Sequence, residues 1–226
     1  MSALLIAIVG AESTGKSLLA QDLTLRLTEA TGLRCASVPE LLRSWCEAAG
    51  RTPRPDEQNG IASEQTARID AAASVNDIVV CDTTALMTAV YSQYLFQDDS
   101  LLAQAQAFHK RCALTLLTAL DLPWVADGIQ RDGPQVRAPV DALIRRALLG
   151  AGLAWSVVTG LEQARVDAAL NVITPLLKAK PSPKRGLFSR LSERQDAQPE
   201  WRWACENCDV PECEHLVLQR AYSPLA

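Results

Sequence analysis

The stretch 8-IVGAESTGKSLLA-20 constrains the fold of this 226-residue chain more than any other feature. It matches the phosphate-binding pattern G-x-x-x-x-G-K-[ST] and lies between an apolar run and a segment with leucines at helical spacing. A loop of this kind needs a strand before it and a helix after it, because its backbone N–H groups then converge on phosphate oxygens at the helix N-terminus. The sequence therefore predicts a nucleotide-binding α/β domain.

Each position of this loop has an expected role in binding ATP. Lys16 would reach the β- and γ-phosphates, and the Ser17 hydroxyl would bind Mg²⁺. The alternative, an ordinary glycine turn, does not explain why all four defining positions of the pattern match. The residues expected to bind the nucleotide are Gly10, Glu12, Ser13, Thr14, Gly15, Lys16 and Ser17.

Short apolar runs alternate with helix-like segments along residues 1–177. This alternation predicts a three-layer α/β sandwich, in which five parallel strands have helices on both faces. Two of the helices are expected over 17–30 and 136–149, the second with an interruption at Pro139. The apolar runs are 3-ALLIAIV-9, 34-RCASV-38, 78-IVV-80, 113-ALTLLTAL-120 and 153-LAWSVV-158.

Besides the glycine loop, an acidic residue is expected at the end of a strand that neighbours the first strand. The segment 77-DIVVCDTT-84 supplies Asp82 at such a position. Asp82 would hold Mg²⁺ or accept the proton of an attacking hydroxyl. The alternative is that Asp82 only caps the helix that begins near Thr84. If Ser17 and Asp82 share one Mg²⁺, the first and third strands must be neighbours.

The polar segment 121-DLPWVADGIQRDGPQVRAP-139 contains glycines and two arginines, Arg131 and Arg137. In small phosphoryl-transfer enzymes such a segment closes over the γ-phosphate, brings arginines to the developing charge and excludes water. The alternative is a solvated loop with two surface arginines. A GTPase is disfavoured, because the sequence contains no Asn-Lys-x-Asp motif for reading guanine.

Four segments of the chain are informative when taken together: 10-GAESTGKS-17, 38-VPELLRSW-45, 81-CDTT-84 and 121-DLPWVADGIQR-131. They resemble the nicotinamide-riboside kinase domain of the NadR type, within the P-loop nucleoside kinases. Relatives of this domain are often named AAA-type ATP-binding proteins. The resemblance covers roughly residues 4–177 and implies the strand order 2-3-1-4-5. It also implies transfer of a phosphoryl group from ATP, with Mg²⁺, to the 5′-hydroxyl of nicotinamide riboside or a similar nucleoside.

The same resemblance implies which residues contact the nucleoside. Trp124 would stack on the cationic nicotinamide ring, Asp127 would lie near the nucleoside, and Arg131 would be a lid arginine. Glu40 and Arg43 would be substrate-side groups after the second strand. The alternatives are a core or interface tryptophan at Trp124 and an (i, i+3) surface ion pair between Glu40 and Arg43.

One position departs from the family pattern. The family has Asp-Thr-Asp at the end of the third strand, whereas this chain has 82-DTT-84, with Thr84 in place of the second acid. A second function therefore stays open at this point, a nucleotide-dependent regulatory or binding module without riboside kinase activity.

Composition limits the partners of the chain. A net charge of -4 and a pI near 5.3 give no general attraction to nucleic acid or to an anionic membrane. Residues 1–9 read as a strand rather than a signal peptide, and the weakly polar run 147–161 is too short for a membrane span. We expect a cytoplasmic protein that binds neither nucleic acid nor a membrane.

The composition changes after Leu177. Residues 178–200 combine prolines, serines and alternating charges, which is typical of a solvated linker. In the tail 201–226, a Cys-x₂-Cys-x₄-Cys-x-His pattern predicts a structural zinc site. A redox Cys-x-x-Cys pair and incidental thiols are the alternatives. The tail could also dock a protein partner. The predicted zinc ligands are Cys205, Cys208, Cys213 and His215.

Overall fold

The structure, a computed structural model, describes residues 3–125 and 133–178. Five strands form one parallel sheet in the order β2-β3-β1-β4-β5. The predicted α/β sandwich and its strand order are therefore confirmed. The described elements are β1 (Leu4–Val9), α1 (Lys16–Thr31), β2 (Cys35–Val38), α2 (Leu41–Ala49), η1 (Pro55–Glu57), α3 (Gln58–Val75), β3 (Ile78–Asp82), α4 (Ala85–Phe96), α5 (Leu102–His109), β4 (Leu114–Thr118), η3 (Pro134–Val136), α6 (Arg137–Gly150), β5 (Ser156–Val158) and α7 (Glu162–Lys178).

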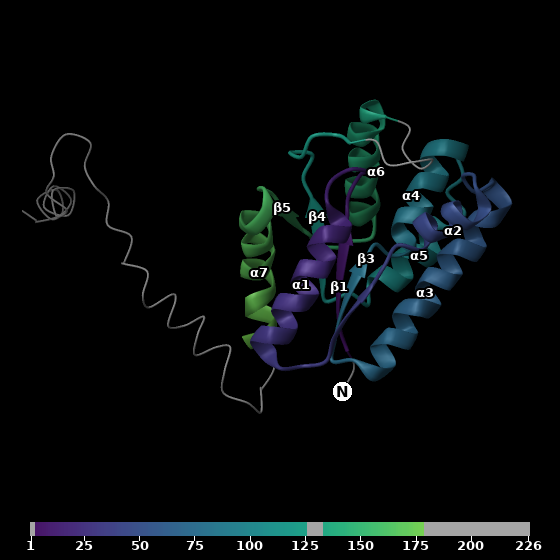
Figure 1. The fold of residues 1–226 in the computed structure, drawn as a ribbon. Helices are drawn as coiled ribbons and strands as arrows, with labels where there is room; N and C mark the ends of the chain where they lie inside the picture. Colours follow the sequence, from purple (N-terminus) through teal and green to yellow (C-terminus); the bar gives the residue numbers. More distant parts are fainter. Residues whose placement is uncertain (1–2, 126–132, 179–226) are drawn as a thin grey trace, which may run out of the picture. The chain divides into compact units, whose positions relative to one another are not determined.

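Helices cover both faces of the sheet (Figure 1). Helices α1 and α7 pack against each other on one face, and α3, α4, α5 and α6 lie on the other. Strand β1 is central, so all of its residues are buried. This position explains why the first strand reads as a continuous apolar run instead of an alternating one.

The register of the sheet brings three strand ends together. Ile8 of β1 pairs with Asp82 at the end of β3, and Val9 pairs with Leu117 of β4. Strands β1 and β3 are neighbours, as a Mg²⁺ ion shared by Ser17 and Asp82 requires. The glycine loop, Asp82 and Thr118 consequently lie at the same edge, the carboxyl edge, where ligands of open parallel sheets bind.

Two local expectations were wrong. Strand β5 is shorter than the predicted run 153–158, because Leu153 still belongs to the turn after α6 and donates its N–H to the Leu148 carbonyl. Helix α6 is not interrupted at Pro139, because this proline lies in its first turn, where a backbone N–H has no intrahelical partner.

Within the described part of the chain, every helix is too short or too polar to cross a membrane.

Candidate functional site

The glycine loop joins β1 to α1, and it requires glycine at two positions, at one because of a close contact and at the other because of the backbone conformation. A Cβ atom at Gly10 would collide with the Thr118 hydroxyl. Gly15 has φ +76° at the position before α1, a left-handed conformation that L side chains rarely adopt. The loop therefore runs close to β4 and turns directly into the helix N-terminus.

Side chains inside the loop fix its shape. The Lys16 ammonium donates to the Ala11 carbonyl at 2.8 Å, and the Thr14 hydroxyl donates to the same oxygen at 2.7 Å. The Thr118 hydroxyl lies 2.7 Å from the Thr14 hydroxyl. Lys16 is buried at the N-terminus of α1. The helix dipole favours an anion at this end of the helix.

Arg165 of α7 is buried behind the glycine loop, and sequence reasoning missed it. Its Nη1 donates to the Asp121 carboxylate at 2.9 Å and to the Gly160 carbonyl at 2.7 Å. Its Nη2 donates to the Thr14 carbonyl at 2.9 Å and to the Ala119 carbonyl at 3.4 Å. One guanidinium therefore ties the glycine loop to the segments that follow β4 and β5.

Asp121 completes this network. Its second carboxylate oxygen accepts from the Gly160 backbone N–H at 2.7 Å. Burial alone raises the pKa of Asp121, but the hydrogen bonds from Arg165 and Gly160 outweigh burial and keep the pKa below its ordinary value. Asp121 is therefore ionised at neutral pH and compensates the charge of Arg165.

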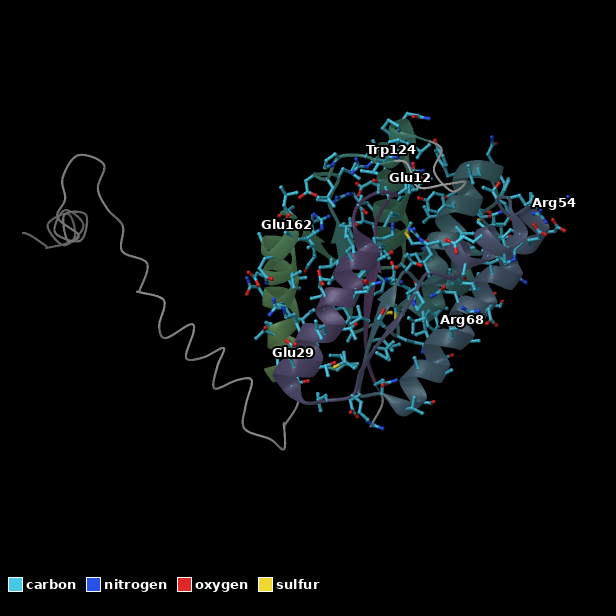
Figure 2. All side chains as sticks on the ribbon, in the orientation of Figure 1. Glu12, Glu29, Arg54, Arg68, Trp124 and Glu162 are labelled. Carbon is cyan, nitrogen blue, oxygen red and sulfur yellow. The ribbon has the colours of Figure 1, made fainter. Side chains whose placement is uncertain are left out.

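The segment after Asp121 starts across the tip of the glycine loop. The Trp124 indole N–H donates to the Glu12 carboxylate at 3.1 Å, and these two side chains lie together at the loop tip (Figure 2). The Ser13 hydroxyl accepts from the Val125 N–H at 2.8 Å and lies 3.5 Å from the Pro123 carbonyl. Trp124 is half-buried and in contact with the nucleotide-binding loop.

Asp82 is buried at the end of β3, and its Oδ1 has no hydrogen-bond partner among the described residues. It does not cap the following helix, because Thr84 is the N-cap of α4 and its hydroxyl accepts from the Leu86 N–H. A buried carboxylate oxygen without a donor is unfavourable unless a cation or water fills the position. Asp82 thus fits the chemistry of a Mg²⁺ ligand better than that of a cap.

Thr84, at the position where the resemblance implies a second acid, is fully buried. Besides capping α4, its hydroxyl lies 2.9 Å from Nδ1 of His109. The hydroxyl is already used by two protein groups, so this position supplies a structural contact where an acid would supply a charge.

Arg137, which the sequence predicts as a catalytic cation, is the first residue of α6. In the structure its side chain is buried. Its Nη1 donates to the Leu122 carbonyl at 2.8 Å, while Nε and Nη2 have no acceptor in the described part of the chain. Leu122 lies against Gly15, since a Cβ there would be 2.9 Å from the Leu122 side chain. A buried cation with unused donors beside the glycine loop fits an anionic ligand.

The predicted substrate residues Glu40 and Arg43 lie at the start of α2 and are partly exposed. The Gln65 side chain of α3 fixes this start, because it accepts from the Leu41 N–H at 2.7 Å and donates to the Pro39 carbonyl at 3.3 Å. A role of Glu40 and Arg43 in substrate binding stays a prediction.

Several predicted residues lie outside the described residues. Asp127 and Arg131 fall in the segment 126–132, and the proposed zinc ligands Cys205, Cys208, Cys213 and His215 fall in 179–226. Residues 3–125 and 133–178 contain no cluster of three or more metal-binding side chains. The boundaries proposed for the linker and the tail stay predictions.

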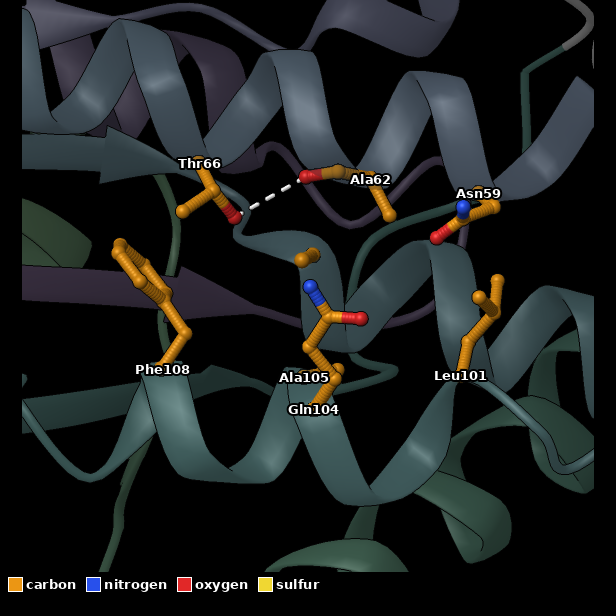
Figure 3. Close-up of a pocket in the computed structure, with 8 residues that line it drawn as sticks. Asn59, Ala62, Thr66, Leu101, Gln104, Ala105 and Phe108 are labelled. Carbon is orange, nitrogen blue, oxygen red and sulfur yellow. Dashed lines mark hydrogen bonds between the residues drawn. The ribbon is translucent and has the colours of Figure 1, made fainter.

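A small cavity of about 60 Å³ lies between α3, α4 and α5 (Figure 3). This volume admits a few water molecules, whereas sites for small organic ligands measure roughly 300 to 1,000 Å³. The cavity is therefore not a preformed nucleoside site. Its lining residues are Asn59, Ala62, Thr66, Ala85, Leu101, Gln104, Ala105 and Phe108.

Solved structures with the same fold include two of NadR. One, in complex with NAD and AMP-PNP, has a TM-score of 0.59 and 18% identity over 80% of this chain and 51% of its own. The other, in complex with NR, has a TM-score of 0.58 and 19% identity over 75% of this chain and 49% of its own. This chain thus spans about half the length of NadR. At this identity the likeness shows the fold alone.

Thymidylate kinase from Ehrlichia chaffeensis has a TM-score of 0.54 and 16% identity, over 78% of this chain and 100% of its own. No curated protein matches the sequence. The model of the AAA domain family matches residues 5–165, which include the glycine loop, Asp82 and Arg165. This match covers more than half of the chain, and the protein belongs to the AAA domain family.

Proposed function

We propose that this protein is an ATP-dependent nucleoside kinase, which transfers the γ-phosphate of ATP to the 5′-hydroxyl of nicotinamide riboside or a similar nucleoside. The observation that carries the proposal is the pairing of the glycine loop with Asp82, whose buried Oδ1 has no partner among the described residues. NadR, which shares the fold, has been crystallised with NAD and AMP-PNP and with NR.

The ATP phosphates would bind at the N-terminus of α1, where Lys16 and the backbone N–H groups of the loop supply positive charge. Ser17 and Asp82 would hold Mg²⁺, which neutralises phosphate charge when bound. Arg137 would place its unused donors near the transferred group. Phosphoryl transfer depends mainly on such positioning and charge stabilisation, so these residues supply the kinds of groups that the reaction requires.

Asp82 is also the candidate for orienting the 5′-hydroxyl and accepting its proton. Trp124 would contribute ring stacking to the nucleoside, with Glu40, Arg43 and Asp127 as further contacts. The bond from Trp124 to Glu12 supports this assignment, because it fixes the indole beside the loop that binds the phosphates.

The experiment incubates the full chain with labelled ATP and a panel of nucleosides and looks for the 5′-monophosphate. Lys16→Ala is the control, because it removes a cation worth about 3 to 4 kcal/mol of transition-state stabilisation. Trp124→Ala should raise KM for a nicotinamide nucleoside more than it lowers kcat, because stacking is present in both the ground and transition states. ATP binding without any phosphorylated product would contradict the kinase proposal.

One observation favours a second function, a nucleotide-dependent regulatory or binding module. Thr84 replaces an acid of the family pattern, and its hydroxyl already binds Leu86 and His109. If that acid is needed for transfer, the chain would bind ATP and not phosphorylate a nucleoside. The nucleoside panel separates the two functions.

We also propose that Cys205, Cys208, Cys213 and His215 bind a structural zinc ion. Three thiols and an imidazole are a common tetrahedral ligand set for zinc, and a redox pair would need neither the third cysteine nor the histidine. Protein purified without added metal should contain about one zinc ion per chain. Cys208→Ser should lose the zinc and keep ATP binding; a zinc-free wild-type protein would refute this site.

A further inference from the structure

His109, the last residue of α5, is fully buried and bonded through both ring nitrogens. Its Nδ1 lies 2.9 Å from the Thr84 hydroxyl, and its Nε2 lies 2.9 Å from the Thr115 hydroxyl. Neither the glycine loop nor the proposed substrate contacts account for this arrangement. A histidine that is buried and fully satisfied has a fixed orientation, so whatever it binds is fixed as well.

A neutral imidazole satisfies both contacts, because one nitrogen donates, the other accepts, and each hydroxyl can rotate to match. Burial lowers the pKa of His109 to about 4, so the ring is neutral at physiological pH. Its contribution there is a pair of hydrogen bonds.

The turn that His109 contacts is strained. Thr83, a β-branched residue, has φ +70°, in the left-handed region. Its N–H donates to the Ile8 carbonyl, and the next residue, Thr84, caps α4. A strained residue of this kind costs about 1 to 3 kcal/mol and persists only when its surroundings fix it. Asp82 is the residue immediately before this turn.

The sheet register shows what His109 connects. Thr115 of β4 pairs with Ala7 of β1, and Ala7 pairs with Cys81 of β3, so these three residues form one row across the sheet. The central residue of the row has only a methyl side chain. The His109 ring therefore links β4 to the turn that follows β3, past the central strand.

We propose that His109 is a positioning residue, which fixes Thr84 and the strained turn so that the Asp82 carboxylate points correctly toward the Mg²⁺ of bound ATP. The proposal rests on the proposed function only in so far as that function requires a Mg²⁺–ATP site. Groups that hydrogen-bond directly to a metal ligand typically change metal affinity by about 10- to 100-fold when they are mutated. His109 acts one step further from the metal, through Thr84, so we expect an effect near the lower end of this range.

Two variants of the full chain separate the two hydrogen bonds. His109→Asn carries its amide near the position of Nδ1 and can keep the bond to Thr84. His109→Gln reaches toward the position of Nε2 and can keep the bond to Thr115 while losing Thr84. The readout is ATP affinity by calorimetry across a Mg²⁺ titration that starts in EDTA.

We expect that His109→Gln needs a Mg²⁺ concentration about 10-fold higher than wild type for the half-maximal gain in ATP affinity. The ATP affinity of both variants in EDTA should stay within about twofold of wild type. His109→Asn loses only the bond to Thr115, so it should shift the Mg²⁺ dependence in the same direction by a smaller factor than His109→Gln. Unchanged Mg²⁺ dependence in His109→Gln, or equal losses in the two variants, would overturn the positioning role.

If the His109 variants do not fold, Thr115→Val tests the same link with little change of shape. It should shift the Mg²⁺ dependence in the same direction, and no shift would overturn the proposal. If the ATP affinity of the wild-type protein does not depend on Mg²⁺, the shared metal site is refuted, and with it the proposed function. The absence of nucleoside phosphorylation does not affect these binding measurements.

Discussion

Two buried networks support the carboxyl edge of the sheet, one charged and one neutral. Behind the glycine loop, the Arg165 guanidinium binds Asp121 and backbone carbonyls that include that of Thr14. Behind the turn after β3, the His109 imidazole binds the hydroxyls of Thr84 and Thr115. The charged network holds an irregular loop through its carbonyls, whereas the neutral one holds a strained turn through side chains.

This difference predicts different sensitivities. Removal of a buried charge leaves its partner uncompensated, which is more costly than the loss of neutral hydrogen bonds. A buried neutral histidine, by contrast, makes stability depend on pH. Variants in the charged network of Arg165 can therefore be compared with variants in the neutral network of His109.

The largest effect is expected for Arg165→Ala. The side chain of Arg165 is 5% exposed and that of its partner Asp121 is 33% exposed, so we expect a loss near the lower end of the 3 to 5 kcal/mol range typical of a broken buried pair, about 3 kcal/mol. Arg68→Ala is the matched control, because Arg68 pairs with Glu64 on the surface of α3 and should cost only about 0.3 to 0.5 kcal/mol. Urea unfolding measures both, and equal losses would contradict the structural role of Arg165.

The next effect concerns His109 and pH. Its pKa in the folded protein, about 4, lies below the value of about 6.5 expected for an unfolded histidine. The unfolded chain therefore binds more protons between these values, so this stabilisation is complete above about pH 6.5 and is lost as the pH falls toward 4. Between pH 7 and pH 5 the loss from this residue should be about 2 kcal/mol.

The measurement is the free energy of unfolding of wild type and His109→Gln at both pH values. Carboxylates contribute equally to both proteins, so the difference between them isolates the histidine. An identical pH dependence in the variant would show that His109 is not the titrating group.

The smallest effects should come from two threonines of the same strand, β4. Thr118 contacts Thr14 in the glycine loop, and Thr115 contacts His109. Thr118→Val and Thr115→Val should each cost about 1 kcal/mol of stability. Only Thr118→Val should weaken ATP binding in EDTA, and only Thr115→Val should change its Mg²⁺ dependence; calorimetry that shows one pattern for both variants would remove the distinction between the networks.

The sequence predicted the glycine loop, the strands and Asp82, because these depend on local patterns of apolar residues and on short motifs. The strand order came from the family resemblance and was confirmed. The expected interruption at Pro139 was wrong, because a proline breaks a helix only beyond its first turn. Strand β5 is shorter than the apolar run 153–158, because Leu153 belongs to the turn after α6 and donates its N–H to the Leu148 carbonyl.

The two networks could not be predicted in this way. Arg165 and Thr14 are 151 positions apart in the sequence, and no motif links them. For His109 a weak signal existed, since Thr115 and Thr118 are polar residues in an otherwise apolar strand. Such residues indicate buried hydrogen bonds, but their partners depend on how the helices pack.

If the glycine loop and Asp82 form one Mg²⁺–ATP site, the affinity for ATP must depend on Mg²⁺ through Asp82. Wild type should bind ATP more tightly in Mg²⁺ than in EDTA. Asp82→Asn, which keeps the shape and removes the charge, should lose that gain and keep the affinity in EDTA, whereas Lys16→Ala should weaken binding under both conditions. An Asp82→Asn protein that keeps the full gain in ATP affinity with Mg²⁺ would show that Asp82 does not hold the Mg²⁺ of bound ATP.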